Sequence, residues 1–194
     1  TTERSEISKG SAAALPIAAD PRLTVRDLIA AIKSMATTQR LAALAKPRVE
    51  EVRTFNASME ESLRAVAQAA WNNSPISWPR LAMALNEALD PDALIVDELS
   101  TEKTKIFSYI RTQDGGRTRI GRSIQQALGW GVGLSIGAKF ASPDRQVVSL
   151  VGDGAFMFGQ FEALWSMARY NVPVITIVLN NRSYNEPRQR ILGK

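Results

Sequence analysis

The chain has 194 residues, 45% of them hydrophobic and 22% charged, a globular composition that suits one domain of ordinary size with an attached segment. It contains no cysteine and no histidine, which excludes disulfides, thiolate metal sites, a cysteine nucleophile and a Ser-His-Asp triad within these residues. No apolar run approaches the roughly 20 residues that a membrane helix needs, so we expect no membrane partner and, by default, a cytoplasmic protein.

The net charge of +5 draws attention to a basic stretch at residues 111–122. Three interpretations of it stay open: a solvated loop face, a contact with a phosphate or substrate anion, or a nucleic-acid contact. The stretch lacks interleaved aromatic residues, so we expect the solvated face and no nucleic-acid partner.

Residues 1–35 hold too few elements to build a core. The apolar run Leu15–Ala19 predicts a short strand, and Thr24–Met35 predicts a helix because its apolar residues recur at spacings of three and four. Thr24 is the expected N-cap of that helix. A strand and one helix cannot bury a core alone, so we interpret residues 1–35 as the C-terminal tail of a preceding domain.

Residues 36–73 are rich in Ala, Arg, Glu and Gln and predict a linker of two helices, the second over Ser58–Trp71. A new unit is expected to begin at residue 74. Its first helix has Ser77 as the expected N-cap and Pro79 in the first turn.

From there, apolar strands alternate with helices up to residue 194. Strands are predicted at Ala93–Asp97, Val147–Val151 and Val172–Leu179, with helices at Ser123–Ala138 and Phe161–Tyr170 between them. Strands that are apolar on both faces indicate an α/β fold whose parallel sheet carries helices on both faces. We therefore expect residues 74–194 to form one domain, in truncated form because only three core strands are visible.

The most informative motif is Gly152-Asp153-Gly154, followed after 25 residues by Asn180-Asn181. The intervening residues hold a helix and a strand, so the motif spans a right-handed crossover between parallel strands. Asp153 and Asn181 then follow the carboxyl ends of two strands. If those strands are neighbours, both side chains can point into one crevice, where open parallel sheets bind ligands.

Carboxylate, amide and main-chain oxygens are hard ligands that suit Mg²⁺ rather than zinc. One carboxylate binds Mg²⁺ weakly, so the remaining ligands should come from water and from a phosphorylated ligand. Gly152 and Gly154 allow the backbone to turn sharply and approach that ligand. The N–H groups of the next helix, near Ala155, can help to hold its anion.

This pattern resembles the diphosphate-binding motif of thiamine-diphosphate enzymes, a GDG sequence followed two dozen or so residues later by NN. The resemblance extends over Ser74–Arg188. Ala127–Gly131 lies where that family has a glycine segment that cradles the cofactor. Ala163-Leu164-Trp165 together with Tyr170-Asn171-Val172-Pro173 is similar to benzoylformate decarboxylase. Asn180–Tyr184 is similar to acetohydroxyacid synthase. The first segment is similar to the tail of the family's central domain.

The resemblance implies a fold, the thiamine-diphosphate-binding fold in incomplete form, and a set of roles. Asp153 and Asn181 would bind Mg²⁺ through their side chains, and Ser183 through its carbonyl. Leu128 would be the apolar wedge under the thiazolium ring. The other residues expected near the cofactor are Ser100, Thr101, Gly129, Gly152, Gly154, Ala155 and Tyr184.

Two departures qualify the resemblance. The motif spacing is one residue longer than in the compared relatives, and Gly133 stands where the family usually has proline. In addition, nothing here resembles the pyrimidine-binding domain, whose glutamate activates the cofactor. Glu98 belongs to the wrong domain to replace it. We therefore expect a fragment that holds no catalytic side chain of its own and is inactive alone.

The resemblance implies thiamine-diphosphate- and Mg²⁺-dependent cleavage or formation of a C–C bond in a 2-oxo acid, by a decarboxylase or an acetolactate-synthase-like carboligase. The expected partners are the 2-oxo acid, a pyrimidine-binding domain and further subunits in a homodimer or homotetramer. FAD is possible in the family, but nothing in this chain supports it. Two alternatives stay open: a non-catalytic module on the same fold that binds a diphosphate or nucleotide, and a different Mg²⁺-dependent phosphate-binding enzyme.

Overall fold

A computed structural model describes residues 7, 12–101, 103–110, 117–121, 127–159 and 161–193. The chain divides into two compact units, Thr1–Met59 and Glu60–Lys194. Helix α2 (Thr38–Ala69) runs from the first unit into the second. This division falls inside a helix, whereas the boundaries expected at residues 35/36 and 73/74 remain predictions.

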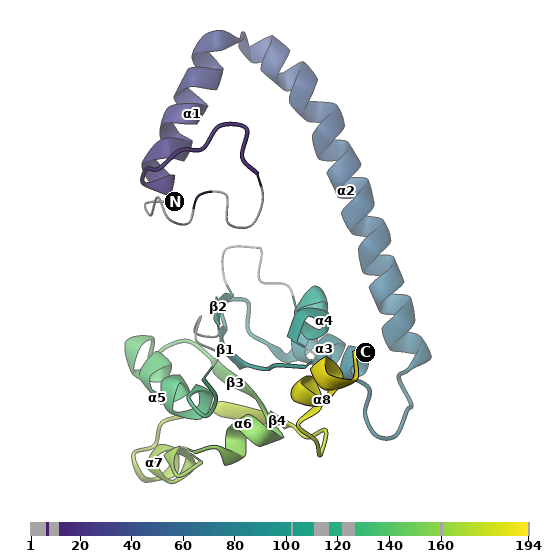
Figure 1. The fold of residues 1–194 in the computed structure, drawn as a ribbon, viewed down its shortest axis with the longest axis vertical. Helices are drawn as coiled ribbons and strands as arrows, with labels where there is room; N and C mark the ends of the chain where they lie inside the picture. The colour runs from purple at the N-terminus through teal and green to yellow at the C-terminus, as the bar shows by residue number, and fades with distance from the viewer. Residues whose placement is uncertain are drawn as a thin grey trace. The chain divides into compact units, whose positions relative to one another are not determined.

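The N-terminal unit contains α1 (Pro21–Met35) and the first part of α2 (Figure 1). The expected N-cap, Thr24, is wrong: Asp20 caps α1, and its carboxylate accepts a hydrogen bond from the N–H of Leu23 at 2.9 Å. Thr24 lies inside the first turn, where its hydroxyl donates to the carbonyl of Asp20. The strand expected at residues 15–19 does not form.

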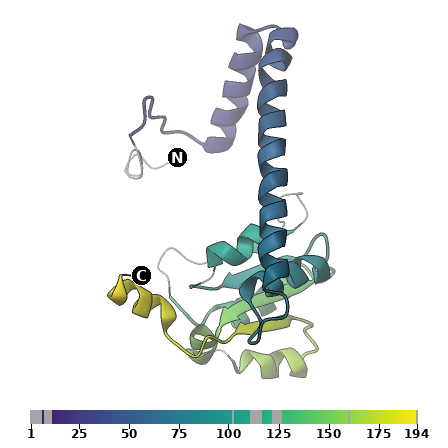
Figure 2. The same cartoon turned by 90° about the vertical axis from the view of Figure 1, so that its right-hand side faces the viewer.

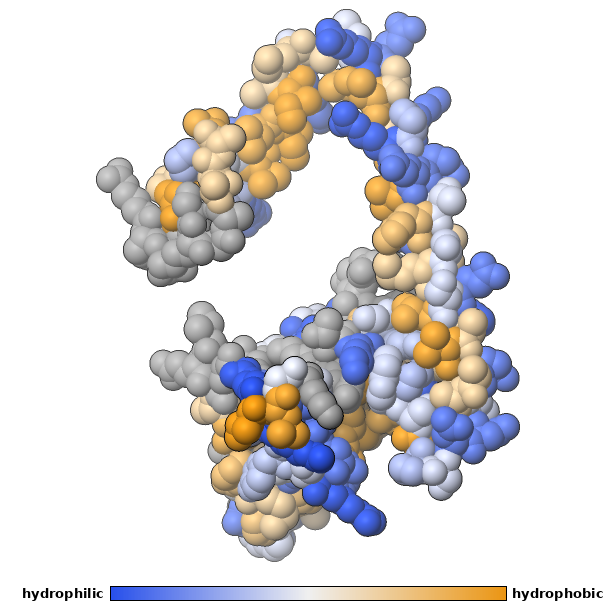
Figure 3. All heavy atoms as spheres, turned by 45° about the vertical axis from the view of Figure 1, so that its right-hand side comes forward, coloured by the Kyte–Doolittle hydropathy of each residue, from blue (hydrophilic) through white to orange (hydrophobic). Residues whose placement is uncertain are grey.

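The apolar stripe that predicted α1 is present but not buried. No residue of α1 is buried, and Val25, Leu28 and Ile32 are each about half exposed. Figure 3 shows apolar side chains gathered along the helices of this unit. Among the described residues of this unit, 7 and 12–59, none is buried, so these residues form no core of their own.

Helix α2 corrects the expectation of two linker helices. It continues for 32 residues, and Pro47 lies inside it without ending it. Ala, Arg, Glu and Gln are good helix formers, and their summed preference outweighs one proline. Within the described part of the chain, no helix is both long enough and apolar enough to cross a membrane.

The C-terminal unit is built on a parallel sheet, which confirms the predicted α/β fold. Its strands are β1 (Leu94–Glu98), β2 (Thr118–Ile120), β3 (Val147–Gly152) and β4 (Ile175–Leu179). All pairs are parallel, in the order β2-β1-β3-β4 (Figure 1). Figure 2 shows the same sheet with helices on both sides of it. Strand β2 was not expected, because three residues centred on Arg119 carry no apolar run.

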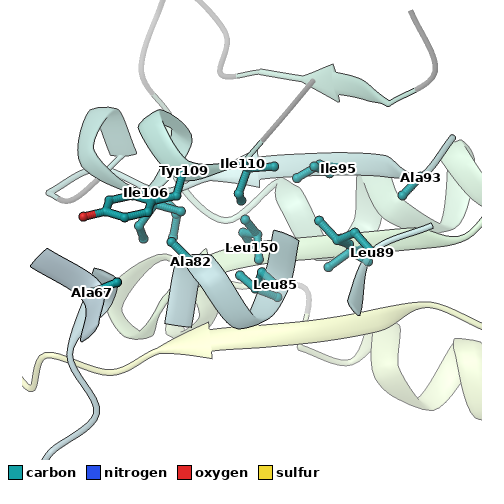
Figure 4. Packing of buried hydrophobic residues seen from close by; sticks show 12 residues of the cluster. Ala67, Ala82, Leu85, Leu89, Ala93, Ile95, Ile106, Tyr109, Ile110 and Leu150 are labelled. Atoms are coloured by element: carbon teal, nitrogen blue, oxygen red, sulfur yellow. The ribbon is translucent and has the colours of Figure 1, made fainter. Parts of the chain in front are cut away.

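Helices cover both faces of this sheet. On one face, α3 (Trp78–Ala88) and α4 (Lys103–Tyr109) form the larger core with the second half of α2 (Figure 4). On the other, α5 (Gly131–Ala141) and α7 (Ala163–Arg169) pack on β1 and β3. The short α6 (Asp153–Met157) follows β3, and α8 (Asn185–Leu192) follows β4. The predicted cap of α3 is confirmed, since the Ser77 hydroxyl accepts a hydrogen bond from the N–H of Arg80.

Two predicted boundaries are wrong in ways that affect the site. Helix α5 begins at Gly131 rather than Ser123, so residues 127–130 form a non-helical segment ahead of it, while residues 122–126 lie outside the described part. Strand β4 begins at Ile175 rather than Val172. The crossover from β3 to β4 contains two short helices, α6 and α7, in place of one.

Candidate functional site

The carboxyl ends of β1, β3 and β4 meet at one edge of the sheet. In the strand register, Glu98 pairs with Val151, and Gly152 pairs with Leu179. Asp153 therefore follows β3 directly beside the start of the Asn180-Asn181 turn that follows β4. The two halves of the motif lie side by side, as the spacing predicted.

A cavity of about 1220 Å³ opens at this edge. Ten of the eleven residues predicted to contact a cofactor line it: Ser100, Thr101, Leu128, Gly152, Asp153, Gly154, Ala155, Asn181, Ser183 and Tyr184. The rest of the wall is mixed: Ile76, Trp78, Leu81 and Ile177 are apolar, and Glu98, Glu186 and Arg190 are charged. The remaining predicted residue, Gly129, is not among the residues that line the cavity.

The Gly152-Asp153-Gly154 turn connects β3 to α6 without a loop, because α6 begins at Asp153. The Asp153 side chain is partly buried, and within the described residues no side chain or N–H group is bonded to it. Gly154 faces the ring of Tyr184, which would lie 3.2 Å from a Cβ atom added at that position. A carboxylate with no internal partner thus stands on a closely packed cavity wall.

The turn after β4 is held by its own side chains. The amide oxygen of Asn180 accepts a hydrogen bond from the N–H of Arg182, and that of Asn181 accepts one from the N–H of Ser183, each at 2.9 Å. Arg182 adopts a φ of 54°, a conformation that such side-chain bonds help to stabilise. An amide oxygen has two lone pairs, so Asn181 can keep this bond and still bind a cation.

Leu128 is 39% exposed and lines the cavity, so it is not an ordinary core residue. Ser100 and Thr101 form the bend between β1 and α4 and line the same cavity.

Sequence reasoning missed the role of Glu98. Its side chain is 2% exposed, and its carboxylate accepts hydrogen bonds from the N–H groups of Gly129, Trp130 and Gly131. The only signal in the sequence is an acidic residue at the end of a buried strand. That signal does not reveal which groups it contacts.

Two arginines of the basic stretch bond to groups of the protein while keeping part of their surface exposed, so the solvated face expected for this stretch stays a prediction. Arg119 binds the fully buried carboxylate of Asp97 through two hydrogen bonds, at 2.5 and 3.0 Å, and stacks on the ring of Phe107. Arg117 donates to the carbonyls of Asn86, Leu89 and Asp90. Arg111 and Arg122 lie outside the described residues.

The cavity wall at Trp78 rests on a buried phenol. The rings of Trp78 and Tyr109 meet edge to face, with centroids 5.7 Å apart. Burial raises the pKa of Tyr109 above its ordinary value of 10.0, because an ionised phenolate would lose its hydration. Tyr109 therefore stays neutral and acts as packing behind the wall.

The arrangement can hold a cation together with an anionic ligand. Asp153 offers a carboxylate oxygen, Asn181 an amide oxygen, and the turn between them and α8 offers main-chain carbonyls. Among the described residues, no group of three or more His, Cys, Asp or Glu side chains gathers at one point. A cation here would therefore draw on amide and main-chain oxygens and on its ligand, as Mg²⁺ commonly does.

Comparison with known proteins identifies the fold family of this site. Residues 103–190 match the family described as "Thiamine pyrophosphate enzyme, C-terminal TPP binding domain". The chain is 31% identical over 141 residues to benzoylformate decarboxylase from Pseudomonas aeruginosa, covering 72% of this chain and 26% of that protein.

Other relatives extend the match. A protein of Methanocaldococcus jannaschii named "Probable acetolactate synthase large subunit" is 25% identical over 184 residues, covering 92% of this chain and 29% of the relative. A 2-hydroxyacyl-CoA lyase from Oryza sativa subsp. japonica is 29% identical over 123 residues, covering 61% and 21%. The chain spans between a quarter and a third of the length of the first curated relatives that it matches.

Proposed function

Because the chain belongs to the thiamine pyrophosphate enzyme family through residues 103–190, we propose that it supplies the diphosphate- and Mg²⁺-binding half of a thiamine diphosphate site. The whole enzyme would cleave or form a C–C bond in a 2-oxo acid, as a decarboxylase or as a carboligase. The bound cofactor supplies the carbon nucleophile and the electron sink that this chemistry requires.

One observation carries the proposal: Asp153 and Asn181 follow adjacent strand ends and line one cavity, and the Asp153 carboxylate has no bond to any described group. A buried or half-buried carboxylate without an internal partner favours a cation. The oxygen donors match the preference of Mg²⁺, and the cavity volume of about 1220 Å³ leaves room for a large ligand. The residues present therefore fit the cofactor and its metal.

Each residue has a proposed task. Asp153 and Asn181 would hold Mg²⁺ through side-chain oxygens, and Ser183 through its main-chain carbonyl. Leu128 would support the thiazolium ring from the apolar side of the wall. The remaining lining residues would surround the diphosphate: Ser100, Thr101, Gly152, Gly154, Ala155 and Tyr184.

The other half of the site would come from a pyrimidine-binding domain, with which a thiamine-pyrophosphate-binding domain works. That domain would supply the glutamate that activates the cofactor. We propose that this domain belongs to the same polypeptide or to a partner subunit in a homodimer or homotetramer.

The test is calorimetric titration of thiamine diphosphate into the full polypeptide, first with Mg²⁺ and then with EDTA. We expect saturable binding with Mg²⁺ and no detectable heat with EDTA. Release of CO₂ from a panel of 2-oxo acids, with separation of aldehyde from hydroxyketone products, then assigns the reaction. Tighter Mg²⁺-dependent binding of nucleotides, or diphosphate binding without turnover of any 2-oxo acid, would overturn the proposal in favour of the alternatives.

A further inference from the structure

Glu98 ends β1 on the face of the sheet that α5 covers. Its carboxylate oxygens accept hydrogen bonds from three consecutive main-chain groups: Oε1 from the N–H groups of Gly129 and Trp130, the latter at 3.1 Å, and Oε2 from Gly131 at 2.6 Å. Gly131 begins α5, Trp130 is its N-cap and Gly129 precedes it, and N–H groups at a helix start have no partner within the helix. Trp130, the N-cap residue, makes no side-chain cap bond of its own. Glu98 therefore caps α5 from another element.

Burying this carboxylate has a cost. Removing a carboxylate from water costs several kcal/mol unless strong donors replace the water. Here three charge-assisted hydrogen bonds and the positive end of the α5 dipole compensate for that loss. An apolar side chain would fill the same space without needing hydrogen-bond donors. What the carboxylate contributes is therefore the conformation that it imposes on residues 129–131.

The imposed conformation is tight. A Cβ atom added at Gly131 would lie 2.7 Å from Oε2 of Glu98 and 2.9 Å from its Cβ. Gly129 has a φ of +93°, and a Cβ atom there would lie 3.3 Å from the main chain of Phe158, which follows α6. Both glycines are required by close approach. Residues 129–131 are thus held between Glu98 at the end of β1 and Phe158 at the end of α6, an arrangement that we call the clamp.

The clamp reaches the other walls of the cavity. The ring of Phe158 lies 6.0 Å from the ring of Tyr184, and Tyr184 in turn covers Gly154. Close approaches thus lead from Glu98 through Gly129 and Phe158 to Tyr184, which faces Gly154 and follows the turn that carries Asn181. Leu128, immediately before Gly129, extends from the clamped segment into the cavity.

We propose that Glu98 is a positioning residue for the cofactor: it fixes residues 129–131 so that Leu128 is presented to the cavity at the level of the metal-binding turns. Glu98 transfers no proton in this role, which separates it from the activating glutamate of the pyrimidine-binding domain. The proposal rests on the proposed function, because the group that Leu128 supports is the bound thiamine diphosphate.

The experiment compares Glu98→Gln and Glu98→Asp with the wild type in the full polypeptide. Glu98→Gln keeps the length but replaces one acceptor oxygen with a donor, and Glu98→Asp keeps the charge but withdraws it by one methylene. Two controls are matched to them: Glu162→Gln, an exposed carboxylate at the start of α7, and Leu85→Ala, a cavity in the core on the opposite face. The readouts are amide hydrogen exchange of residues 128–134, the Kd for thiamine diphosphate with Mg²⁺, and kcat and KM.

We expect both Glu98 variants to speed exchange at residues 130–131 and to raise Kd, each by roughly tenfold, which is about 1.4 kcal/mol. They should lower kcat while KM for the 2-oxo acid changes little. Leu85→Ala should lower the thermal midpoint and leave exchange at residues 130–131 and the Kd unchanged. Glu162→Gln should leave every readout unchanged.

Two results would overturn the proposal. Wild-type exchange in both Glu98 variants would refute the clamp, whatever the protein binds. Faster exchange with an unchanged Kd would refute the role toward the cofactor. A wild-type protein that fails to bind thiamine diphosphate would instead refute the proposed function, and the exchange measurement would still decide whether the clamp exists.

Discussion

The ends of β1 and β3 lie side by side, and both carry acidic residues in opposite situations. Asp97 and Glu98 are buried, and their oxygens are occupied by Arg119 and by the N–H groups that begin α5. Asp153 is partly buried, lines the cavity and has no bonding partner within the described residues. An acidic residue at a strand end therefore does not identify a ligand group by itself. What separates these carboxylates is the hydrogen-bond donors around them: Asp97 and Glu98 accept internal hydrogen bonds, whereas Asp153 accepts none from the described residues.

We expect the largest effect on cofactor binding when the carboxylate of Asp153 is removed. Asp153→Ala should weaken Mg²⁺-dependent binding of thiamine diphosphate by at least roughly 100-fold, about 2.8 kcal/mol, because Asp153 is the one carboxylate in the proposed set of Mg²⁺ ligands. Calorimetry with Mg²⁺ measures this. Asp144→Ala, at an exposed turn before β3, is the control and should bind as the wild type does. Unchanged affinity in Asp153→Ala would refute the metal assignment and, with it, the contrast between the two strand ends.

Substitutions around the internally bonded carboxylate of Asp97 should change the stability of β1 rather than the binding of the cofactor. Arg119→Met removes the Arg119 guanidinium from the buried carboxylate of Asp97, and we expect β1 to lose about 2 to 3 kcal/mol of protection against local opening. Hydrogen exchange of the β1 amides measures the loss. Arg53→Met, which breaks an exposed ion pair with Glu50, should cost less than about 0.5 kcal/mol. Equal effects of the two variants would mean that Asp97 is satisfied without Arg119.

Alanine substitutions at two glycines of α5 should have smaller effects on stability, with opposite signs. Gly131→Ala should destabilise α5 by about 1 to 3 kcal/mol, because the new methyl group would overlap the Glu98 carboxylate. Gly137→Ala meets no atom within 4 Å and should stabilise the helix by up to about 1 kcal/mol through its better helix propensity. Thermal unfolding followed by circular dichroism gives both signs. A neutral Gly131→Ala would show that the Glu98 contact adjusts freely.

The helix caps predicted from short segments of sequence had mixed outcomes. Ser77 as the cap of α3 was predicted from its own side chain and the following proline, and it is confirmed. The Thr24 cap failed because Asp20, just before Pro21, offers a better acceptor one turn earlier. Strand β2 escaped prediction because it is held by pairing with β1 and by the bond from Arg119 to Asp97, not by an apolar run.

The sequence by itself determined that apolar strands alternate with helices and that Asp153 and Asn181 follow two of those strands, because both features depend on neighbours along the chain. Only the tertiary structure decided that β3 and β4 pair directly, that Leu128 faces the cavity, and that Glu98 is committed to the start of α5. The bonds from Glu98 join residues 31 to 33 positions apart. Such contacts depend on how the elements pack, and no local pattern in the sequence encodes the identity of the partner.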